Sequence, residues 1–172
     1  EAGWKFNNIV IENNYCEHFG QGAMLNFYQA TDLWHDVLIR NNVFKDGTNG
    51  MAIGGIQNVK IYNNTFVNLA YSGEGPQAVT NPASSCTGGE IKNNIYYNVY
   101  YDTFAPVYWM SAQCGDQSDP ASVSNNLIFT PNNAHTWRQS NYPNDIVNQD
   151  PLFVNPLNDF HITQNSPAKD AV

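Results

Sequence analysis

Six residues in two segments of the chain combine the side-chain types that bind and cleave sugars. The aromatic residues are Tyr71, Tyr100, Tyr101 and Trp109, and the carboxylates are Glu74 and Asp102. Aromatic rings stack on the apolar faces of sugars, and carboxylates accept from sugar hydroxyls or act as acid and base in glycoside hydrolysis. We therefore expect a carbohydrate-binding site whose catalytic candidates are Glu74 and Asp102. The alternative is that these rings fill the interior of the fold or seal the loops over it.

These side chains belong to two long segments, residues 70–89 and 99–122, that lie between copies of a repeated motif. The motif is I-x-N-N-x-[aromatic or apolar], and its second asparagine is Asn14, Asn42, Asn64, Asn94 and Asn126. Consecutive copies are 28, 22, 30 and 32 residues apart, which exceeds a hairpin repeat and matches one turn of a β-solenoid with side loops. Both segments are too long for corners, so we expect them to project as loops on adjacent turns.

Two columns of the motif alternate with polar positions, which is the period-2 pattern of strands with one buried face. They are Ile11, Ile39, Ile61, Ile91 and Val123 before the asparagine pair, and Cys16, Phe44, Phe66, Tyr96 and Ile128 after it. Asparagine tolerates the left-handed backbone of a corner, and stacked amides bond between turns. Asparagine pairs also mark hairpins in β-sandwiches, but those turns favour Asn-Gly, and no glycine follows any of the five pairs.

The stretch NVKIYNNTFVN, residues 58–68, resembles the right-handed parallel β-helix repeat of pectate-lyase-like proteins. Residues 150–172 resemble the closing segment of secreted β-helix proteins, which in that family forms the last turn and ends near an S-P-A-x-D-A motif. The resemblance implies an all-β fold, a right-handed parallel β-helix of roughly six turns with projecting side loops. We expect one domain, residues 1–172, with 150–172 as its closing segment. The family's usual N-terminal capping helix is missing before residue 6, so the chain is either the C-terminal part of a longer β-helix or has an open first turn covered by another chain.

The resemblance also implies a function, because most characterised members of the family act on polysaccharides. It implies a secreted polysaccharide lyase or glycoside hydrolase that binds an extended glycan on its lateral loops. The alternative is a non-catalytic structural or adhesive β-helix that makes end-to-end contact with another β-helix chain in a cell-surface or filamentous assembly. Two interpretations remain for the cationic residues Arg40, Lys60 and Lys92. They form either a cationic strip of the kind that β-helix polysaccharide lyases use, or a solvated face of ion pairs such as Glu12–Arg40. The acidic ligands and lysine of the calcium-dependent families are not found, so we predict no cofactor, and Ca²⁺ stays an option that no motif supports.

Charge and hydropathy limit the partners. The net charge of −8 argues against nucleic acid, whose phosphates need clustered Lys and Arg. The negative charge also disfavours binding of a polyanionic sugar, unless a bound cation bridges the sugar and the protein. A neutral glycan is not repelled in this way. No run of about 18 apolar residues occurs, so we predict no membrane insertion.

Two further pairs of residues fall at similar positions of neighbouring copies. Cys86 and Cys114 are 28 residues apart, about one turn, so we expect a disulfide between them and a free, buried Cys16. A disulfide indicates an extracellular or cell-surface location. His18 and Asp46 each follow the second asparagine by four residues, and they are either a proton-transfer couple or two corner residues.

Overall fold

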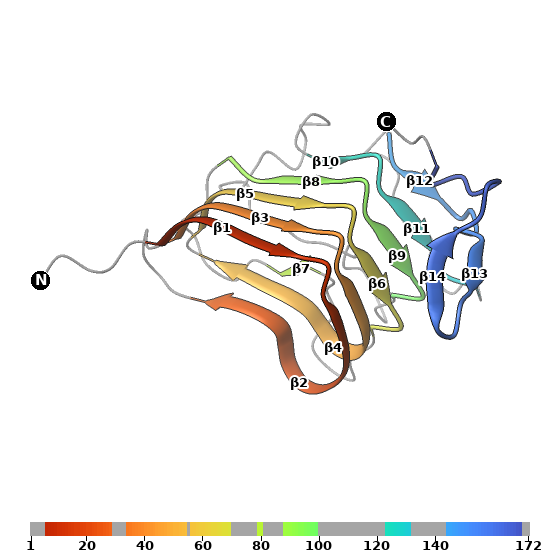
Figure 1. Cartoon of the computed structure of the whole chain (residues 1–172), viewed down its shortest axis with the longest axis horizontal. Coiled ribbons are helices and arrows are strands. Elements are labelled where there is room, and N and C mark those ends of the chain that lie inside the picture. The colour runs from red at the N-terminus through yellow and green to blue at the C-terminus, as the bar shows by residue number, and fades with distance from the viewer. Residues whose placement is uncertain are drawn as a thin grey trace, which may run out of the picture.

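A computed structural model describes residues 6–28, 34–54, 56–69, 79–80, 88–99, 123–131 and 144–169. Over these ranges the protein is all-β, as predicted, and most of its strands lie in two parallel sheets (Figure 1). Each of the five Asn-Asn copies contributes one strand to each sheet, so consecutive strands alternate between the sheets. Within the described ranges, no helix is long and apolar enough to cross a membrane.

The strands of each sheet follow one another in the order of the repeat. The first sheet consists of β1 (Phe6–Glu12), β3 (Trp34–Arg40), β5 (Ile56–Tyr62), β8 (Glu90–Lys92) and β10 (Val123–Ser124). The second consists of β2 (Tyr15–Tyr28), β4 (Val43–Gly54), β6 (Thr65–Val67), β9 (Ile95–Tyr97), β11 (Leu127–Phe129) and β12 (Ile146–Val147). In addition, β7 (Val79–Thr80) pairs with β4, and β13 (Phe153–Asn155) pairs with β14 (Asp159–Ile162).

Residues with left-handed backbone make the bends between and within strands. The first asparagine of every pair has a φ of 53° to 59°, as the motif predicts. A second left-handed column consists of His18, Asp46, Asn68 and Asn98, and a third consists of Asn8, Asp36, Asn58 and Gly88. Asparagine and aspartate adopt this conformation more readily than other non-glycine residues. The corners therefore account for much of the excess of asparagine, which occurs 26 times.

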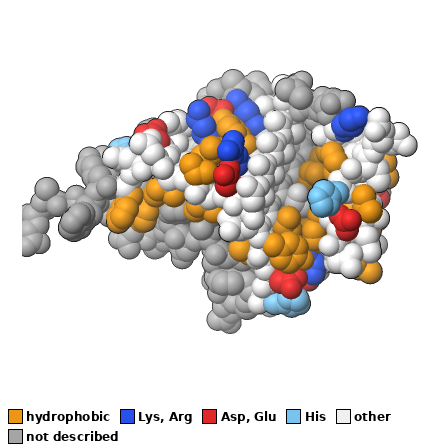
Figure 2. Space-filling model, in the orientation of Figure 1, with side chains coloured by type: hydrophobic (Ala, Val, Ile, Leu, Met, Phe, Trp, Pro, Cys, Tyr) orange, Lys and Arg blue, Asp and Glu red, His pale blue; other side chains and the backbone are white. Residues whose placement is uncertain are grey.

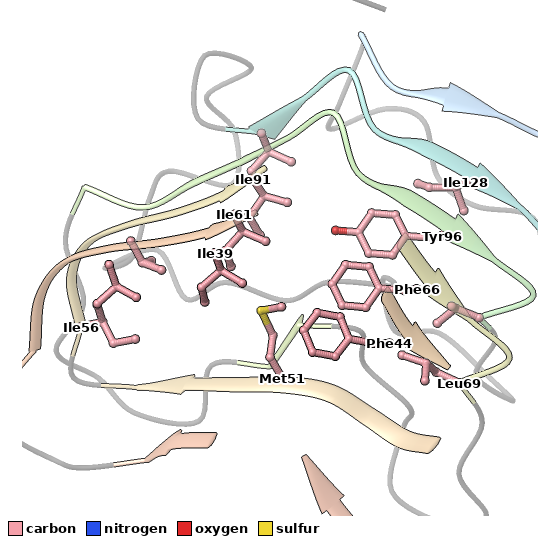
Figure 3. Close-up of a cluster of buried hydrophobic side chains, with 14 residues drawn as sticks. Ile39, Phe44, Met51, Ile56, Ile61, Phe66, Leu69, Ile91, Tyr96 and Ile128 are labelled. Atoms are coloured by element: carbon pink, nitrogen blue, oxygen red, sulfur yellow. The ribbon is translucent and has the colours of Figure 1, made fainter. Parts of the chain in front are cut away.

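Both predicted apolar columns lie inside, between the two sheets (Figure 3). The column that starts at Ile11 is in register across the first sheet, and Ile39, Ile61 and Ile91 are completely buried. In the facing column, the ring of Phe66 stacks on its neighbours in β4 and β9, with centroid distances of 5.2 and 4.9 Å. Burying such apolar area from water is the main term that stabilises the fold.

The first copy of the repeat is less buried than the others. Ile11 and Cys16 are only half-buried, because β1 and β2 are edge strands among the described residues. Cys16 packs against the core and its thiol is free, as predicted, but the prediction that it is buried was wrong. Cys86 and Cys114 lie outside the described residues.

In the closing segment, the two described strands pair with each other and not with either parallel sheet. Within residues 150–172, β13 and β14 form an antiparallel hairpin. The side-chain oxygen of Asn155 accepts from the backbone N–H of Leu157 at 3.0 Å, and the backbone N–H of Asn158 donates to the carbonyl of Asn155 at 3.2 Å. These local bonds reverse the chain within three residues, which a parallel connection cannot do.

Aromatic packing holds this hairpin against the outward side of the second sheet. The ring of Phe153 lies 5.4 Å from the ring of Tyr97, which alternates with the inward residues of β9. Phe160 of β14 packs edge-on against Phe153, also at 5.4 Å, and lies 6.5 Å from the ring of Tyr15 in β2. The hairpin therefore crosses several copies of the repeat (Figure 1).

Candidate functional site

The second asparagine of each pair points inward and joins a hydrogen-bonded ladder. The backbone N–H and Nδ2 of Asn64 both donate to Oδ1 of Asn94, at 2.9 and 3.0 Å. In turn, Oδ1 of Asn64 accepts from the same two groups of Asn42, at 3.1 and 3.0 Å. The same pair of bonds joins Asn14 to Asn42 and Asn94 to Asn126. The ladder satisfies the polar groups that the corner places inside the fold.

The ladder ends on a residue that the sequence prediction missed. Asp145 is 5% exposed, and its Oδ1 accepts from the backbone N–H and Nδ2 of Asn126 at 2.9 and 3.2 Å. Since β12 follows it and pairs with β11, residues 144–148 are a sixth copy of the repeat in which aspartate replaces the second asparagine. Every bond between members of the ladder is donated toward the C-terminus, so its last member needs only to accept, as a carboxylate does.

The first asparagine of each pair faces outward, and its side chain has no hydrogen-bond partner among the described residues. This outer column consists of Asn13, Asn41, Asn63, Asn93 and Asn125. No hydrogen bond joins these side chains to any other residue that the structure describes. The backbone N–H groups at these positions are satisfied without the side chains, since those of Asn41, Asn63 and Asn93 donate to carbonyls of the next strand at 3.2 to 3.3 Å. The outer amides therefore remain available as donors and acceptors, one per copy, at a strand spacing of roughly 4.8 Å.

Four members of the outer column line a groove of about 500 Å³ between the corners and the C-terminal hairpin. They are Asn41, Asn63, Asn93 and Asn125. Phe160, His161 and Ile162 of the hairpin line it from β14, and the first residues of β6, β9 and β11 contribute Thr65, Ile95 and Leu127. Figure 2 shows the column as an uncharged stripe between the hairpin and a cluster of charged side chains over β1, β3, β5 and β8. The lining is thus amide-rich on one side and largely apolar on the other.

An imidazole stands at the rim of this groove. Nδ1 of His161 lies 2.6 Å from Oδ1 of Asp159, and this hydrogen bond lowers the pKa of the Asp159 carboxyl. The side chain of His161 is 91% exposed. The sequence pattern assigned no role to His161, because its relation to the groove depends on where the hairpin packs.

The charged cluster beside the groove is built of paired groups. Nε of Arg40 lies 2.7 Å from Oε2 of Glu12, which confirms the predicted cross-strand pair. Glu90 lies 2.8 Å from Nζ of Lys92 and accepts from the hydroxyl of Tyr62 at 2.6 Å. Burial alone would raise the pKa of Glu90, but the bonds from Lys92 and Tyr62 outweigh it and lower the pKa. These contacts favour the ion-paired face over a cationic strip.

The contacts of His18 and Asp46 favour corner positions over a proton-transfer couple. Both have left-handed backbone, and Asp46 accepts from Nδ2 of Asn68 at 2.9 Å and pairs with Lys45. Burial alone would raise the pKa of Asp46, but the bonds from Lys45 and Asn68 outweigh it and lower the pKa. Nδ1 of His18 lies 3.6 Å from a carboxylate oxygen of Glu17. Lys45 also lies 3.7 Å from Glu17, as the register of the repeat predicts.

The sugar-binding and catalytic residues predicted from the sequence lie outside the described residues. They are Tyr71, Tyr100, Tyr101, Trp109, Glu74 and Asp102. Among the residues that the structure does describe, no group of three or more His, Cys, Asp and Glu side chains is arranged to hold a metal ion.

Comparison of the chain with protein-family models, curated proteins and solved structures found no match. The groove and its asparagine wall are therefore the features from which a function can be inferred.

Proposed function

We propose that the chain is a right-handed parallel β-helix whose lateral groove binds an extended, uncharged polysaccharide. Two parallel sheets that each gain one strand per copy support the β-helix, with each copy of the repeat as one turn. The resemblance of residues 58–68 to pectate-lyase-like repeats supports the same fold.

The observation that carries the functional proposal is the row of amides along one wall of the groove, which make no side-chain hydrogen bond to any other described residue. An amide offers two N–H donors and a carbonyl acceptor, which match the mixed donor and acceptor character of sugar hydroxyls. Because these amides recur at one strand spacing, roughly 4.8 Å, they suit a polymer that presents the same hydroxyls again and again. The ring of Phe160 and the side chain of Ile95 supply apolar contacts for the faces of the sugar rings.

Electrostatics favour a neutral glycan over a polyuronate. The described lining of the groove contains no Asp, Glu, Lys or Arg, and the chain as a whole carries a net charge of −8. A polyanion would be repelled by that net charge and would find no lysine or arginine in the described lining. Since amides do not titrate near neutral pH, the wall of the groove binds its ligand rather than transferring protons.

Catalysis remains part of the proposal through residues outside the groove wall. Glu74 and Asp102 are proposed as the acid and base of a glycoside hydrolase or lyase. The proposed stacking platforms are Tyr71, Tyr100, Tyr101 and Trp109. A secreted or cell-surface location belongs to the same proposal, because polysaccharides of this kind are met outside the cell. The groove serves a non-catalytic, adhesive protein equally well.

The test is a double substitution of Asn63 and Asn93 by glycine, measured by calorimetric titration with linear neutral oligosaccharides and with oligogalacturonate. Glycine keeps the left-handed backbone and removes only the amide. Each lost hydrogen bond is worth about 0.5–1.5 kcal/mol, so the loss of two should raise the Kd for the neutral ligand about fivefold or more.

Asn13→Gly is the matched control, because Asn13 belongs to the same column but is absent from the lining of the groove. Its Kd should stay within twofold of the unchanged protein. The proposal is wrong if only the uronate binds, or if the double variant and the control bind the neutral ligand equally well.

A further inference from the structure

One polar side chain belongs to the hairpin side of the groove, which is otherwise apolar. The described lining on this side is Phe160, His161, Ile162 and Ala168, and only His161 has side-chain atoms that form hydrogen bonds. The opposite wall consists of the outer asparagine amides and the first residues of β6, β9 and β11. In ligand sites with an apolar lining, a few well-placed polar groups fix the orientation of the ligand. The imidazole of His161 is the candidate for that role on the hairpin side.

Asp159 determines which ring nitrogen of His161 is free. Oδ1 of Asp159 lies 2.6 Å from Nδ1 of the ring and accepts from the backbone N–H of His161 at 3.1 Å. These bonds lower the pKa of the Asp159 carboxyl, which is therefore ionised at neutral pH. Because an ionised carboxylate only accepts, Nδ1 must carry the proton of the bond between the two side chains. In the neutral ring Nε2 is then an acceptor, and no described residue donates to it.

We propose that Nε2 of His161 accepts a hydrogen bond from a hydroxyl of the bound polysaccharide, and that Asp159 positions the ring for this contact. The inference rests on the proposed function and adds to it the group that contacts the ligand from the hairpin side. An ether or ester oxygen at the same point of the ligand has no proton to donate, so it would leave Nε2 without a partner. The groove therefore selects a chain whose hydroxyls on this side are free of methyl and acyl groups.

The same contact makes binding depend on pH. Imidazole is the side chain that ordinarily changes its charge between about pH 5 and pH 8, and protonation of His161 would remove the acceptor at Nε2. The charged and titratable groups around the ring are Asp159 on its own strand, Tyr15 and Glu17 on β2, which pair with each other at 3.0 Å, and the exposed Lys169. The described lining contains no Asp, Glu, Lys or Arg and no second histidine. A neutral glycan should therefore bind more weakly at pH 5 than at pH 8.

Calorimetric titration with cellohexaose, mannohexaose and xylohexaose at both pH values tests the contact. His161→Phe keeps a flat ring and removes both nitrogens, and the side chain is 91% exposed, so the fold should tolerate the change. The loss of one hydrogen bond should raise the Kd at pH 8 by about two- to tenfold. The variant should also lose the difference in Kd between pH 5 and pH 8.

Nitrogen NMR of the histidine rings separates contact from an indirect effect. A saturating hexasaccharide should shift the Nε2 resonance of His161 and leave Nδ1 in its bond to Asp159. His18 and His35 lie outside the described lining of the groove and are the internal controls in the same spectrum. Asp159→Asn tests the positioning role, because an amide can donate to Nδ1 as well as accept from it. Without ligand, this variant should show a second ring tautomer of His161, and its Kd should rise.

The outcomes distinguish this inference from the proposed function. If the double substitution of Asn63 and Asn93 weakens binding but His161→Phe does not, the groove binds the glycan and the contact with His161 is refuted. A ligand that shifts the resonances of His18, His35 and His161 alike would refute it too. If none of the three hexasaccharides binds the unchanged chain, the proposed function is wrong and the contact with His161 is wrong with it.

Discussion

Replacing Asn64 by aspartate tests whether the inner ladder depends on donors as well as acceptors. Asn64 is completely buried, and its Nδ2 lies 3.0 Å from Oδ1 of Asn94. The same Nδ2 lies 3.0 Å from the carbonyl oxygen of Ile39 and 3.1 Å from that of Tyr62. Aspartate has nearly the same shape, but it puts an oxygen where all three neighbouring atoms are acceptors. The change is thus electrostatic rather than steric.

The expected loss of stability is large. Leaving a buried charge without a compensating partner costs about 3–5 kcal/mol. The aspartate avoids this cost only by keeping its proton, which raises its folded pKa above the unfolded value of about 3.9. Above pH 4 the unfolded chain then binds fewer protons than the folded one, so the variant loses about 1.4 kcal/mol per pH unit until the folded pKa is reached.

Urea unfolding of Asn64→Asp at pH 4 and pH 7, followed by circular dichroism, measures both effects. The free energy of unfolding should fall by about 3 kcal/mol or more at pH 7, and by clearly less at pH 4. Asn63→Asp is the control, because it adds the same charge to the neighbouring exposed, left-handed residue. It should change stability by under about 1 kcal/mol. Equal effects of the two variants at pH 7 would refute the directional role of the ladder.

Two further predictions follow from the interior and from the charged cluster. Phe66→Ala removes the central ring of the aromatic stack and should lower the free energy of unfolding by about 3–5 kcal/mol in urea titrations. A loss below about 1 kcal/mol would contradict the complete burial of Phe66. Burial and the bond to Glu90 raise the pKa of Tyr62, so above pH ~10 the unfolded phenol ionises first and stability falls. In Tyr62→Phe this alkaline loss should shrink, and NMR titration should show the pKa of Glu90 rising toward its ordinary value. An unchanged pKa of Glu90 would mean that the lysines near it, Lys92 and Lys60, lower the pKa without Tyr62.

The repeat made the core predictable from the sequence. Five copies of one motif align Ile39 with Ile61 and Phe44 with Phe66, and period-2 alternation then indicates which side chains face inward. The left-handed first asparagine followed from the limited set of residues that tolerate such backbone. These features depend only on local chemistry repeated at a fixed register.

The features missed from the sequence depend on exceptions to the motif or on packing. The sixth copy was not recognised in the sequence because Asp145 stands where the motif has its second asparagine. A residue that only accepts hydrogen bonds is nevertheless suited to the end of the ladder. The third corner column, with Asn8, Asp36 and Asn58, lies inside strands rather than at their ends. The hairpin and its groove depend on how Phe153 and its neighbours pack far from their position in the chain, which no local pattern contains.

Aspartate also ends the other ladders of asparagine amides. Asn98 donates to Asn68, which donates to Asp46, so this ladder runs in the opposite direction to the inner one and ends at a carboxylate. Asn58 likewise donates to Asp36. In each case the side chain at the accepting end of the ladder needs to accept a hydrogen bond but not to donate one, which a carboxylate can do. Aspartate also tolerates the left-handed corner, as asparagine does. An aspartate in an asparagine column therefore marks the end of a ladder and gives its direction.

The two asparagines of each pair have different roles: the first bends the backbone, and the side chain of the second forms hydrogen bonds to neighbouring copies. At Asn63 the backbone bends and its N–H donates to the next strand, while at Asn64 the side chain bonds to the neighbouring copies. Because the corner is satisfied by these two contributions, the amide of Asn63 is not needed to hold the fold. The same repeat that stabilises the interior thus leaves a regular row of polar groups on the surface, and the C-terminal hairpin turns that row into one wall of a groove.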